Sequence, residues 1–313
     1  MFPVIKTENL TKEFRTPFTF KKIQALTDLS LEVERGEIIG YLGPNGAGKT
    51  TTFKLLLGLI SPTRGKIYLW GKDHRETEIK FRIGFLPESP YFYGYLKAKE
   101  YLFFCGQLFG FKLKELRKKL DSLFELTALK EHKNELIKNY SKGMLQRLGL
   151  AQALINDPDL LILDEPMSGL DPLGRKEVRD LILQLKEQGK TILFSTHILS
   201  DVETICDRVA ILINGKLKDC APLENLLSPK IKSFEISIRG LPQEMIDNLQ
   251  ERGLYLIQRG EEVFIRVEEA TAYEILPHLL EKGGRLLSFV PRKETLEDLY
   301  VSEIKSMGEN RLS

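Results

Sequence analysis

The residues GPNGAGKT, at positions 43–50, fit the pattern G-x-x-x-x-G-K-[ST] of a loop that binds phosphate groups. Gly43, Gly46 and Gly48 let the backbone curl so that successive N–H groups face one anion. The helix expected to follow adds the positive end of its dipole. Lys49 is expected to reach the β- and γ-phosphates of a nucleotide, and the Thr50 hydroxyl to ligate Mg²⁺. The predicted phosphate-binding residues are Gly43, Pro44, Asn45, Gly46, Ala47, Gly48, Lys49, Thr50 and Thr51.

Two carboxylates follow an apolar run in LLILDEP, at 160–166. Asp164, at the tip of the expected strand, is placed to hold Mg²⁺ through water, and Glu165 to orient or deprotonate an attacking water. Paired acids after a buried strand are also found at the start of ordinary loops. Because the chain contains a phosphate loop as well, we prefer the catalytic interpretation.

The elements that must position these residues alternate short strands with longer helices over residues 1–220. Several of the strands are continuous apolar runs, which are typical of parallel strands buried on both faces. Between about 95 and 155 the pattern is helical and contains no strand. The sequence therefore predicts an α/β domain with a helical insertion. The strands are expected at 29–33, 37–43, 83–87, 160–166, 191–196 and 209–216.

A second pattern begins after a break near residue 221, which contains two prolines. Residues 232–303 predict the order β-α-β-β-α-β of a smaller, ferredoxin-like α+β domain, followed by an amphipathic segment at 295–305. The same order occurs in RNA-binding folds, whose middle strands stack bases on aromatic residues. Tyr255 and Phe264 lie in the candidate strands, but no basic-aromatic cluster accompanies them, so we expect dimer contact or regulation rather than nucleic-acid binding.

Composition excludes several classes of protein. The formal charge is only +2, from 46 Lys and Arg against 44 Asp and Glu, which argues against a strongly basic nucleic-acid binder. The three cysteines have no zinc-site spacing and suit a reducing cytosol. No run approaches the ~20 apolar residues of a membrane span, and the first residues do not resemble a signal peptide. A cytoplasmic location is therefore expected.

Five motifs occur in a fixed order: GPNGAGKT (43–50), YSKGMLQR (140–147), LLILDEP (160–166), SGLD (168–171) and STH (195–197). In these motifs the chain resembles the ATP-binding-cassette (ABC) ATPases. The resemblance covers about residues 1–220. It implies a P-loop NTPase domain over 1–222, with a mixed sheet core and a helical subdomain at about 90–155. It also implies ATP and Mg²⁺ as cofactors.

The resemblance implies roles for four further residues. Ser141 and Gly143 would bind the ATP that the other subunit holds, which implies a head-to-tail dimer, homodimeric or formed with a related cassette, with two sandwiched ATPs. Asp171 would lie at the dimer seam. His197 would contact the γ-phosphate and hold the water geometry with Glu165. The other three histidines lack such a context and are expected at the surface: His74, His132 and His278.

The chain departs from the family pattern at three positions. Lys142 replaces the first signature glycine and Met144 the signature glutamine, so Ser141 and Gly143 carry that motif. Glu88 stands where the family has a glutamine after the strand at 83–87, and its carboxylate could coordinate Mg²⁺ or a water. By resemblance, adenine would stack on Phe14. The insertion at 15–22 offers two competitors, Phe18 and Phe20.

Aromatic residues are concentrated at 91–111, which holds nine of the chain's 28 Phe, Trp and Tyr residues. Phe103, Phe104 and Phe109 are expected to pack within the helical subdomain. In the family, a groove beside this subdomain receives a coupling helix from a membrane subunit. We expect Tyr91–Tyr95 to line that groove.

The resemblance thus implies the ATPase subunit of an ABC transporter. The signature, the Glu88 loop and the second domain look most like those of the exporter class. Such a subunit would be peripheral on the inner face of the cell membrane, under a separate integral permease. The alternative is a soluble ABC ATPase that acts on ribosomes or nucleic acid. Such proteins usually carry two cassettes or a long coiled coil, and this sequence has one cassette and no sustained heptad run. A third hypothesis is a cassette that binds ATP and signals rather than transports.

Overall fold

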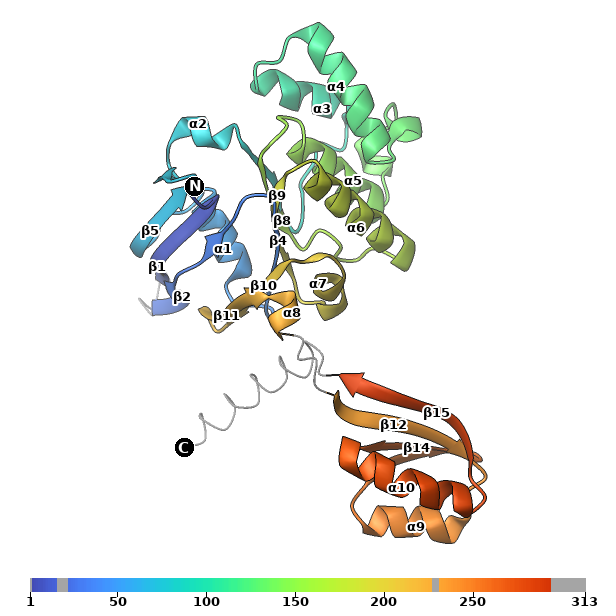
Figure 1. Ribbon diagram of the computed structural model, residues 1–313. Helices are drawn as coiled ribbons and strands as arrows, with labels where there is room; N and C mark the ends of the chain where they lie inside the picture. The colour runs from blue at the N-terminus through green and yellow to red at the C-terminus, as the bar shows by residue number, and fades with distance from the viewer. Residues whose placement is uncertain (1, 16–21, 227–230, 294–313) are drawn as a thin grey trace. The chain divides into compact units, whose positions relative to one another are not determined.

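The computed structural model describes residues 2–15, 22–226 and 231–293 (Figure 1). Contacts divide the chain into two compact units, one that ends at Leu223 and one that begins at Glu224. The predicted segment at 295–305 and the residues Phe18 and Phe20 lie outside the described residues. Within the described part, no helix has the length and hydrophobicity needed to cross a bilayer.

The centre of the first unit is a six-stranded sheet in the order β11-β10-β4-β9-β8-β7. Its neighbouring strands are parallel except β10 and β11, so the expected mixed α/β sheet is confirmed. Every residue of β4, β8 and β9 is buried, which agrees with their continuous apolar runs. The strands are β4 (Ile38–Leu42), β7 (Ile83–Leu86), β8 (Leu160–Asp164), β9 (Thr191–Thr196), β10 (Arg208–Ile213) and β11 (Lys216–Pro222).

Alternate residues of β8 belong to two different cores because successive side chains point to opposite faces of a sheet. Leu161 and Leu163 pack in a core with α3, α4, α5 and α6. Leu160 and Ile162 pack in the other core with α1 and a small antiparallel sheet. The helices of this unit are α1 (Lys49–Leu56), α2 (Thr77–Lys80), α3 (Ala98–Leu108), α4 (Leu113–Leu126), α5 (Lys142–Ala153), α6 (Pro172–Glu187) and α7 (Leu199–Ile205). The short helix α8 (Leu223–Leu226) spans the boundary between the two units.

The antiparallel sheet has the order β2-β1-β5-β6, with β3 paired to β1. The strand expected at 29–33 is wrong as a single strand, because β2 ends at Leu29 and β3 begins at Glu32. The Thr7 hydroxyl donates to the Leu29 carbonyl and accepts from the Leu31 N–H, which replaces ladder bonds at this point. The strands are β1 (Ile5–Arg15), β2 (Lys22–Leu29), β3 (Glu32–Val33), β5 (Arg64–Leu69) and β6 (Lys72–Asp73).

Residues 95–155 form the expected helical region, with one isolated bridge between Lys97 and Leu136. Besides α3, α4 and α5 it contains the short 3₁₀ turns η1 (Lys130–His132) and η2 (Ile137–Asn139). Gly106 lets α3 approach α4 closely, since a Cβ there would lie 2.2 Å from Leu116 Cδ1. Figure 1 shows this helical region projecting beyond one end of the central sheet.

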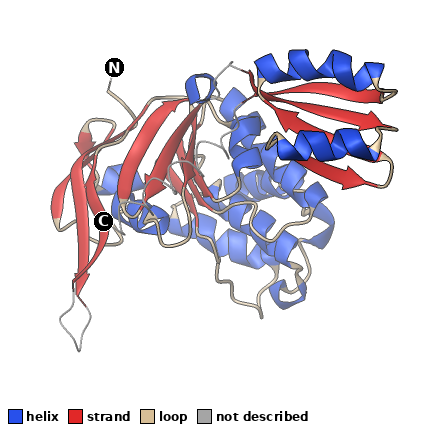
Figure 2. Ribbon diagram, turned by 90° about the horizontal axis from the view of Figure 1, so that it is seen from below, coloured by secondary structure: helices blue, strands red, loops and turns tan. Residues whose placement is uncertain are grey.

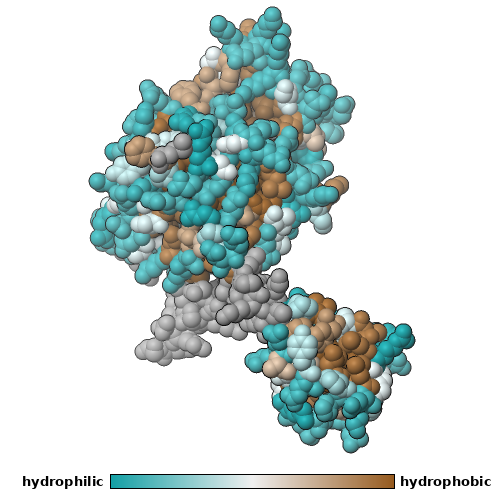
Figure 3. Space-filling view, in the orientation of Figure 1, coloured by the Kyte–Doolittle hydropathy of each residue, from teal (hydrophilic) through white to brown (hydrophobic). Residues whose placement is uncertain are grey.

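The second unit has the predicted element order β-α-β-β-α-β. Its antiparallel sheet runs β13-β14-β12-β15. Phe234, Ile236 and Ile238 of β12 point into one core with residues of both helices, which lie beside the strands in Figure 2. Apolar side chains also remain at the visible surface of this unit (Figure 3). The elements are β12 (Ile231–Arg239), α9 (Gln243–Glu251), β13 (Tyr255–Arg259), β14 (Glu262–Val267), α10 (Glu269–Glu281) and β15 (Arg285–Lys293).

Candidate active site

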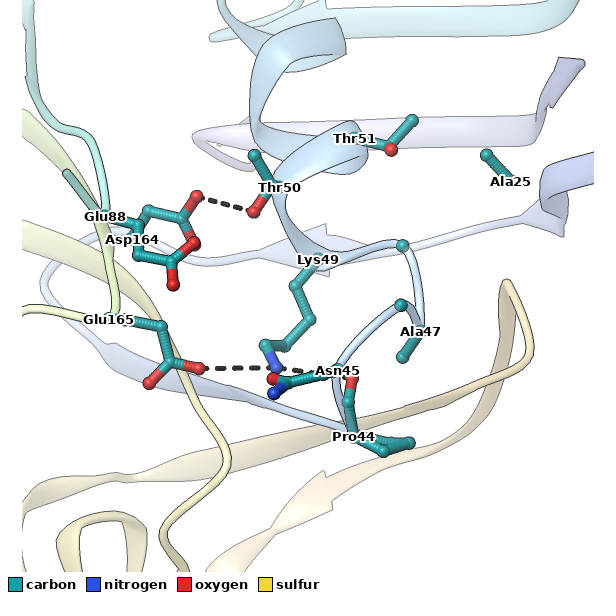
Figure 4. A pocket seen from close by; sticks show the side chains of 12 residues that line it. Ala25, Pro44, Asn45, Ala47, Lys49, Thr50, Thr51, Glu88, Asp164 and Glu165 are labelled. Carbon is teal, nitrogen blue, oxygen red and sulfur yellow. Dashed lines mark hydrogen bonds and ion pairs between the residues drawn. The ribbon is translucent and has the colours of Figure 1, made fainter. Parts of the chain in front are cut away.

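The phosphate-binding loop connects β4 to α1 and walls a cavity of about 260 Å³ (Figure 4). Two glycines are needed for its shape. A Cβ on Gly43 would lie 2.4 Å from the Leu212 carbonyl oxygen. Gly48 has φ +107°, and a Cβ there would lie 2.7 Å from the Ala25 carbonyl oxygen. Sequence and structure therefore agree on a backbone loop that only glycine can close. The cavity is lined by Ala25, Pro44, Asn45, Gly46, Ala47, Gly48, Lys49, Thr50, Thr51, Glu88, Asp164 and Glu165.

Lys49 lies across the floor of this cavity. Its Nζ donates to the Gly43 carbonyl at 2.6 Å and lies 3.3 Å from Glu165 Oε1. Both side chains are less than one-tenth exposed. The pairing offsets part of the cost of burying a cation and a carboxylate away from water.

Asp164, at the end of β8, is hydrogen bonded to both α1 and β9. Asp164 Oδ2 accepts a hydrogen bond from the Thr50 hydroxyl at 2.7 Å. Asp164 Oδ1 accepts from the Ser195 hydroxyl on β9 at 2.5 Å, and that hydroxyl accepts from the Glu165 N–H at 2.9 Å. Glu165 has φ +50°, a strained conformation for a residue with a side chain. The bond to Ser195 helps to hold that conformation.

His197 follows β9, where the sequence places it. Its Nδ1 lies 3.0 Å from Glu165 Oε2 and 3.1 Å from Oε1, and its side chain is 47% exposed. The imidazole therefore contacts the buried carboxylate on one side and remains accessible on the other. This arrangement suits a group that orients a water molecule against Glu165.

The residues predicted to hold a metal are oxygen donors at the cavity. Thr50 and Asp164 are hydrogen bonded to each other, and Glu88 lines the same cavity. In the described residues no three His, Cys, Asp or Glu side chains cluster as a metal site. This donor set fits Mg²⁺, which usually takes one or two protein oxygens and completes its shell with phosphates and water.

The predicted signature residues lie away from the cavity. Ser141 caps α5, accepting from the Met144 N–H at 3.2 Å, and Asp171 caps α6, accepting from the Gly174 N–H at 2.8 Å. Ser141 and Asp171 are both exposed. The structure thus places Lys49, Thr50, Asp164, Glu165 and His197 together and leaves Ser141, Gly143 and Asp171 outside that group.

Residues 26–168 match the family model described as ABC transporter. An uncharacterized ABC transporter ATP-binding protein of Synechocystis sp. is 42% identical over 97% of this chain and 86% of its own length. The bacitracin transport ATP-binding protein BcrA of Bacillus licheniformis is 36% identical over 97% of this chain and 98% of its own length.

The chain belongs to the ABC transporter ATP-binding proteins. It is an ABC ATPase.

Solved structures agree with this assignment. The ATP-binding subunit of an ABC transporter is 32% identical over 71% of this chain and 91% of that one, with a TM-score of 0.63. A dimeric ATP-binding cassette in a post-hydrolysis state, bound to ADP and Pi, is 26% identical over 70% of this chain and 98% of that one, with a TM-score of 0.65. The shared part is the ABC ATPase fold.

Phe14 lies on β1 and pairs with Ile23 of β2. Ile23 precedes Ala25, which lines the ABC cavity, by two residues in the sequence. Its side chain is 40% exposed, and Lys12 Nζ lies 5.0 Å from the ring centroid. Phe14 is not among the residues that line the cavity. Its stacking on adenine stays a prediction.

The aromatic segment is partly as expected. Tyr91, Tyr93 and Tyr95 are 86%, 45% and 73% exposed. Phe103 packs against the helical core, but the expectation that Phe104 packs inside is wrong, because it is 47% exposed on α3. The same expectation is wrong for Phe109, which is 36% exposed, with its ring edge-on to that of Phe81. Phe104 and Leu108 are one turn apart on α3 and share a face of the helix, and that face is not covered by other elements that the structure describes.

The expectation that His74 lies at the surface is also wrong. His74 is 5% exposed, and its Nδ1 has no hydrogen-bond partner. Burial lowers the pKa of His74, and the nearby Asp73 carboxylate opposes that shift. His278 is exposed as expected, and His132 is partly exposed, with 45% of its side chain accessible.

Sequence reasoning missed two residues that support the ABC site. Ser195 is fully buried and links Asp164 to the Glu165 backbone. Gln146 on α5 is 4% exposed and donates to the Pro166 carbonyl at 2.8 Å, which connects the signature helix to the segment after β8. Ser195 is a polar residue in the otherwise apolar and buried strand β9, whereas Gln146 has no such signal in the sequence, because Arg147 follows it directly.

Proposed function

We propose that this chain is the ATP-hydrolysing subunit of an exporter, that it acts as a pair of cassettes, and that it energises a separate membrane permease. The observation that carries the proposal is the network that joins Thr50, Asp164, Ser195 and Glu165 and extends to Lys49 and His197. It supports the proposal because one cavity then offers a cation for phosphate, oxygens suited to a metal and a carboxylate suited to act as a general base.

In this proposal Lys49 and the loop N–H groups bind the β- and γ-phosphates. Glu165 takes a proton from the attacking water, and His197 holds that water against Glu165. Mg²⁺ would be held by Thr50 and Asp164, with Glu88 as a further oxygen donor, and would neutralise charge on the phosphates. The Ser195 hydroxyl keeps Asp164 and the Glu165 backbone in place.

The second half of each ATP site would come from the partner cassette. Ser141 and Gly143 lie at the N-terminus of α5, whose backbone N–H groups and dipole favour an anion. A Cβ at Gly143 would be in ordinary contact with its neighbours, 3.6 Å from Leu170, so the glycine is not required by packing within the chain. This supports a role for its open N–H toward an ATP on another chain, with Asp171 beside the seam.

Permease docking is supported by the exposed rings of Tyr91, Tyr93 and Tyr95, which contact one another at 6.4 and 5.9 Å between centroids. Exposed aromatic clusters are typical of protein interfaces. Export is favoured by the relative named for bacitracin transport, which matches along nearly its whole length. The protein would then lie at the inner face of the cell membrane, and the second unit, proposed here as an accessory domain over 232–303, would serve dimer contact or regulation.

The proposal is tested by mild detergent extraction of native membranes and affinity purification of the full chain. We expect a multi-span membrane protein in stoichiometric amount, and ATP hydrolysis that changes when that protein is reconstituted with the chain. Tyr91→Ala combined with Tyr93→Ala should reduce recovery of the membrane protein, whereas Tyr68→Ala, on β5, should not. Recovery with ribosomes or nucleic acid, and no membrane protein, would overturn the transporter proposal and favour the alternative.

A further inference from the structure

A fully buried carboxylate lies in the first half of α7, four residues after His197. Asp201 is 0% exposed. Its Oδ2 accepts from Arg175 Nη2 at 2.7 Å, and Arg179 Nη1 lies 3.5 Å from its Oδ1. A buried charge is stable only when it is paired, so the two arginines are needed to keep Asp201 in this position.

Both arginines lie on α6, the helix that Asp171 caps. They are one helical turn apart and therefore share a face. The Arg175 N–H donates to the Asp171 carbonyl at 3.0 Å, so the first turn of α6 carries the capping residue at one end and the partner of Asp201 at the other. Residues 168–171 are called the Asp171 segment. A shift of this segment would therefore move Arg175.

The other side of α7 is held against β4. A Cβ on Gly40 would lie 2.7 Å from Cys206 Sγ and 3.1 Å from Val202 Cγ1, so the approach of helix and strand depends on that glycine. Because β4 leads into the phosphate loop, α7 lies between the strand that carries the loop and the helix that carries Arg175. His197 stands directly before α7.

Contact between the Asp171 segment and the start of α7 is open rather than tightly packed. A cavity of about 220 Å³ separates them, lined by Leu170, Pro172, Arg175, Arg179 and Ser200. With space at this point, the charged contacts of Asp201 give the two segments a defined connection that apolar packing does not supply.

We propose that Asp201 is a positioning residue for ATP hydrolysis. Through Arg175 and Arg179 it sets the start of α7, and with it His197, relative to the Asp171 segment. Closure of a partner cassette on Asp171 would thereby be relayed to the histidine that holds the attacking water. The inference rests on the proposed hydrolysis at Glu165 and His197, and it adds the element that aligns them.

The test compares steady-state ATP hydrolysis of purified full-length variants, with the permease where it is required for activity. Arg175→Gln removes the main charge partner of Asp201 and should lower kcat by about ten- to one-hundredfold, the loss expected when a catalytic group is misplaced by about 1 Å. KM for ATP should change less than about twofold, because the phosphate loop is untouched. Arg175→Lys should restore most of kcat.

Lys186→Gln is the matched control. Lys186 also lies on α6 and pairs with Asp207, just after α7, but at the end remote from His197. It should leave kcat within about twofold of the parent, which separates positioning of His197 from general stability of the two helices. Thermal unfolding of each variant establishes that the compared chains are folded.

A double-mutant cycle gives a second readout. If Arg175 and Asp201 act as one unit, Asp201→Asn combined with Arg175→Gln should have a kcat no lower than the worse single variant. Independent, multiplying losses would overturn the inference, as would an unchanged kcat in Arg175→Gln or an equal loss in Lys186→Gln. A parent protein that does not hydrolyse ATP would instead contradict the proposed function itself.

Discussion

The two halves of the proposed ATP site differ in how much of their bonding lies within one chain. Around the phosphate loop, side chains from α1, β8 and β9 form one network, and Asp164 and Glu165 are only 1% and 6% exposed. Ser141 and Asp171 are exposed, and their side chains cap their own helices. The first half is organised by bonds within one chain, whereas the second presents groups to whatever approaches from outside the chain.

The largest expected effect is loss of the cation in the organised half. Lys49→Ala removes the ammonium group that contacts Gly43 and Glu165, and hydrolysis should fall by about 10²–10³-fold, as when a donor to developing charge is removed. Lys54→Ala, exposed on the same helix, is the control and should change hydrolysis little. Phosphate release from ATP measures both. Equal activity of the two variants would contradict the role of Lys49.

The second-largest effect is expected in the other half of the site, which contains Ser141, Gly143 and Asp171. Gly143→Asp places a negative charge where the partner's γ-phosphate is expected, so hydrolysis should fall by about tenfold or more while binding of a fluorescent ATP analogue to the same chain's loop persists. The local space accepts a Cβ, so folding should be retained.

Mixing the Lys49→Ala and Gly143→Asp variants tests whether the two halves of one ATP site come from different chains. In a head-to-tail pair of one Lys49→Ala chain and one Gly143→Asp chain, one site carries both defects and the other carries none. Hydrolysis should therefore rise on mixing above the level of either variant alone. If mixing restores nothing although mixed pairs form, the two halves do not come from different chains.

A smaller effect is expected at the residue that supports the network. Ser195→Ala removes the donor to Asp164 and the acceptor for the Glu165 N–H. We expect kcat to fall by about tenfold, with KM for ATP less affected, because each bond contributes about 1 kcal/mol or slightly more. Thr204→Ala removes a hydroxyl that bonds only within α7 and serves as the control. An increase in KM for ATP with an unchanged kcat would contradict a role of Ser195 in placing Glu165.

The smallest effect lies outside the ATP site. Burial holds the pKa of His74 below its ordinary value, so the unfolded chain binds a proton there more readily. Its contribution to stability is present above the unfolded pKa of about 6.5 and is lost as the pH falls below it. His74→Leu should therefore lose less stability than the parent between about pH 7.5 and 5.5.

Thermal unfolding at the two pH values measures this difference, and the Tm of the parent should fall further on acidification than the Tm of His74→Leu. His278→Leu, at an exposed position, is the control and should follow the parent. If the Tm of the parent and the Tm of His74→Leu fall equally on acidification, His74 does not contribute to the pH dependence of stability.

The sequence predicted which residues of the organised half lie together, because they belong to short motifs next to buried strands. Lys49 and Thr50 follow one strand, and Asp164 and Glu165 another, so local pattern and strand position together place them at the same edge of the sheet. The sheet's parallel core followed from the apolar runs of β4, β8 and β9.

The missed features depend on contacts between distant parts of the chain. Ser195 lies 31 residues from Asp164 in sequence, and its role appears only when β9 lies beside β8. The burial of His74 and the exposure of Phe104 depend on which helix faces the neighbouring elements leave covered. Hydrophobic periodicity gives the faces of an element but not the element that packs against each face.

The most direct test of the account is the mass of the Glu165→Gln chain with ATP and Mg²⁺, measured by size-exclusion chromatography with light scattering. This variant should bind ATP without hydrolysing it, so the closed pair should accumulate. We predict the mass of two chains with ATP and of one chain with ADP. A mass of one chain at saturating, demonstrably bound ATP would contradict the claim that Ser141 and Gly143 complete the site of a partner.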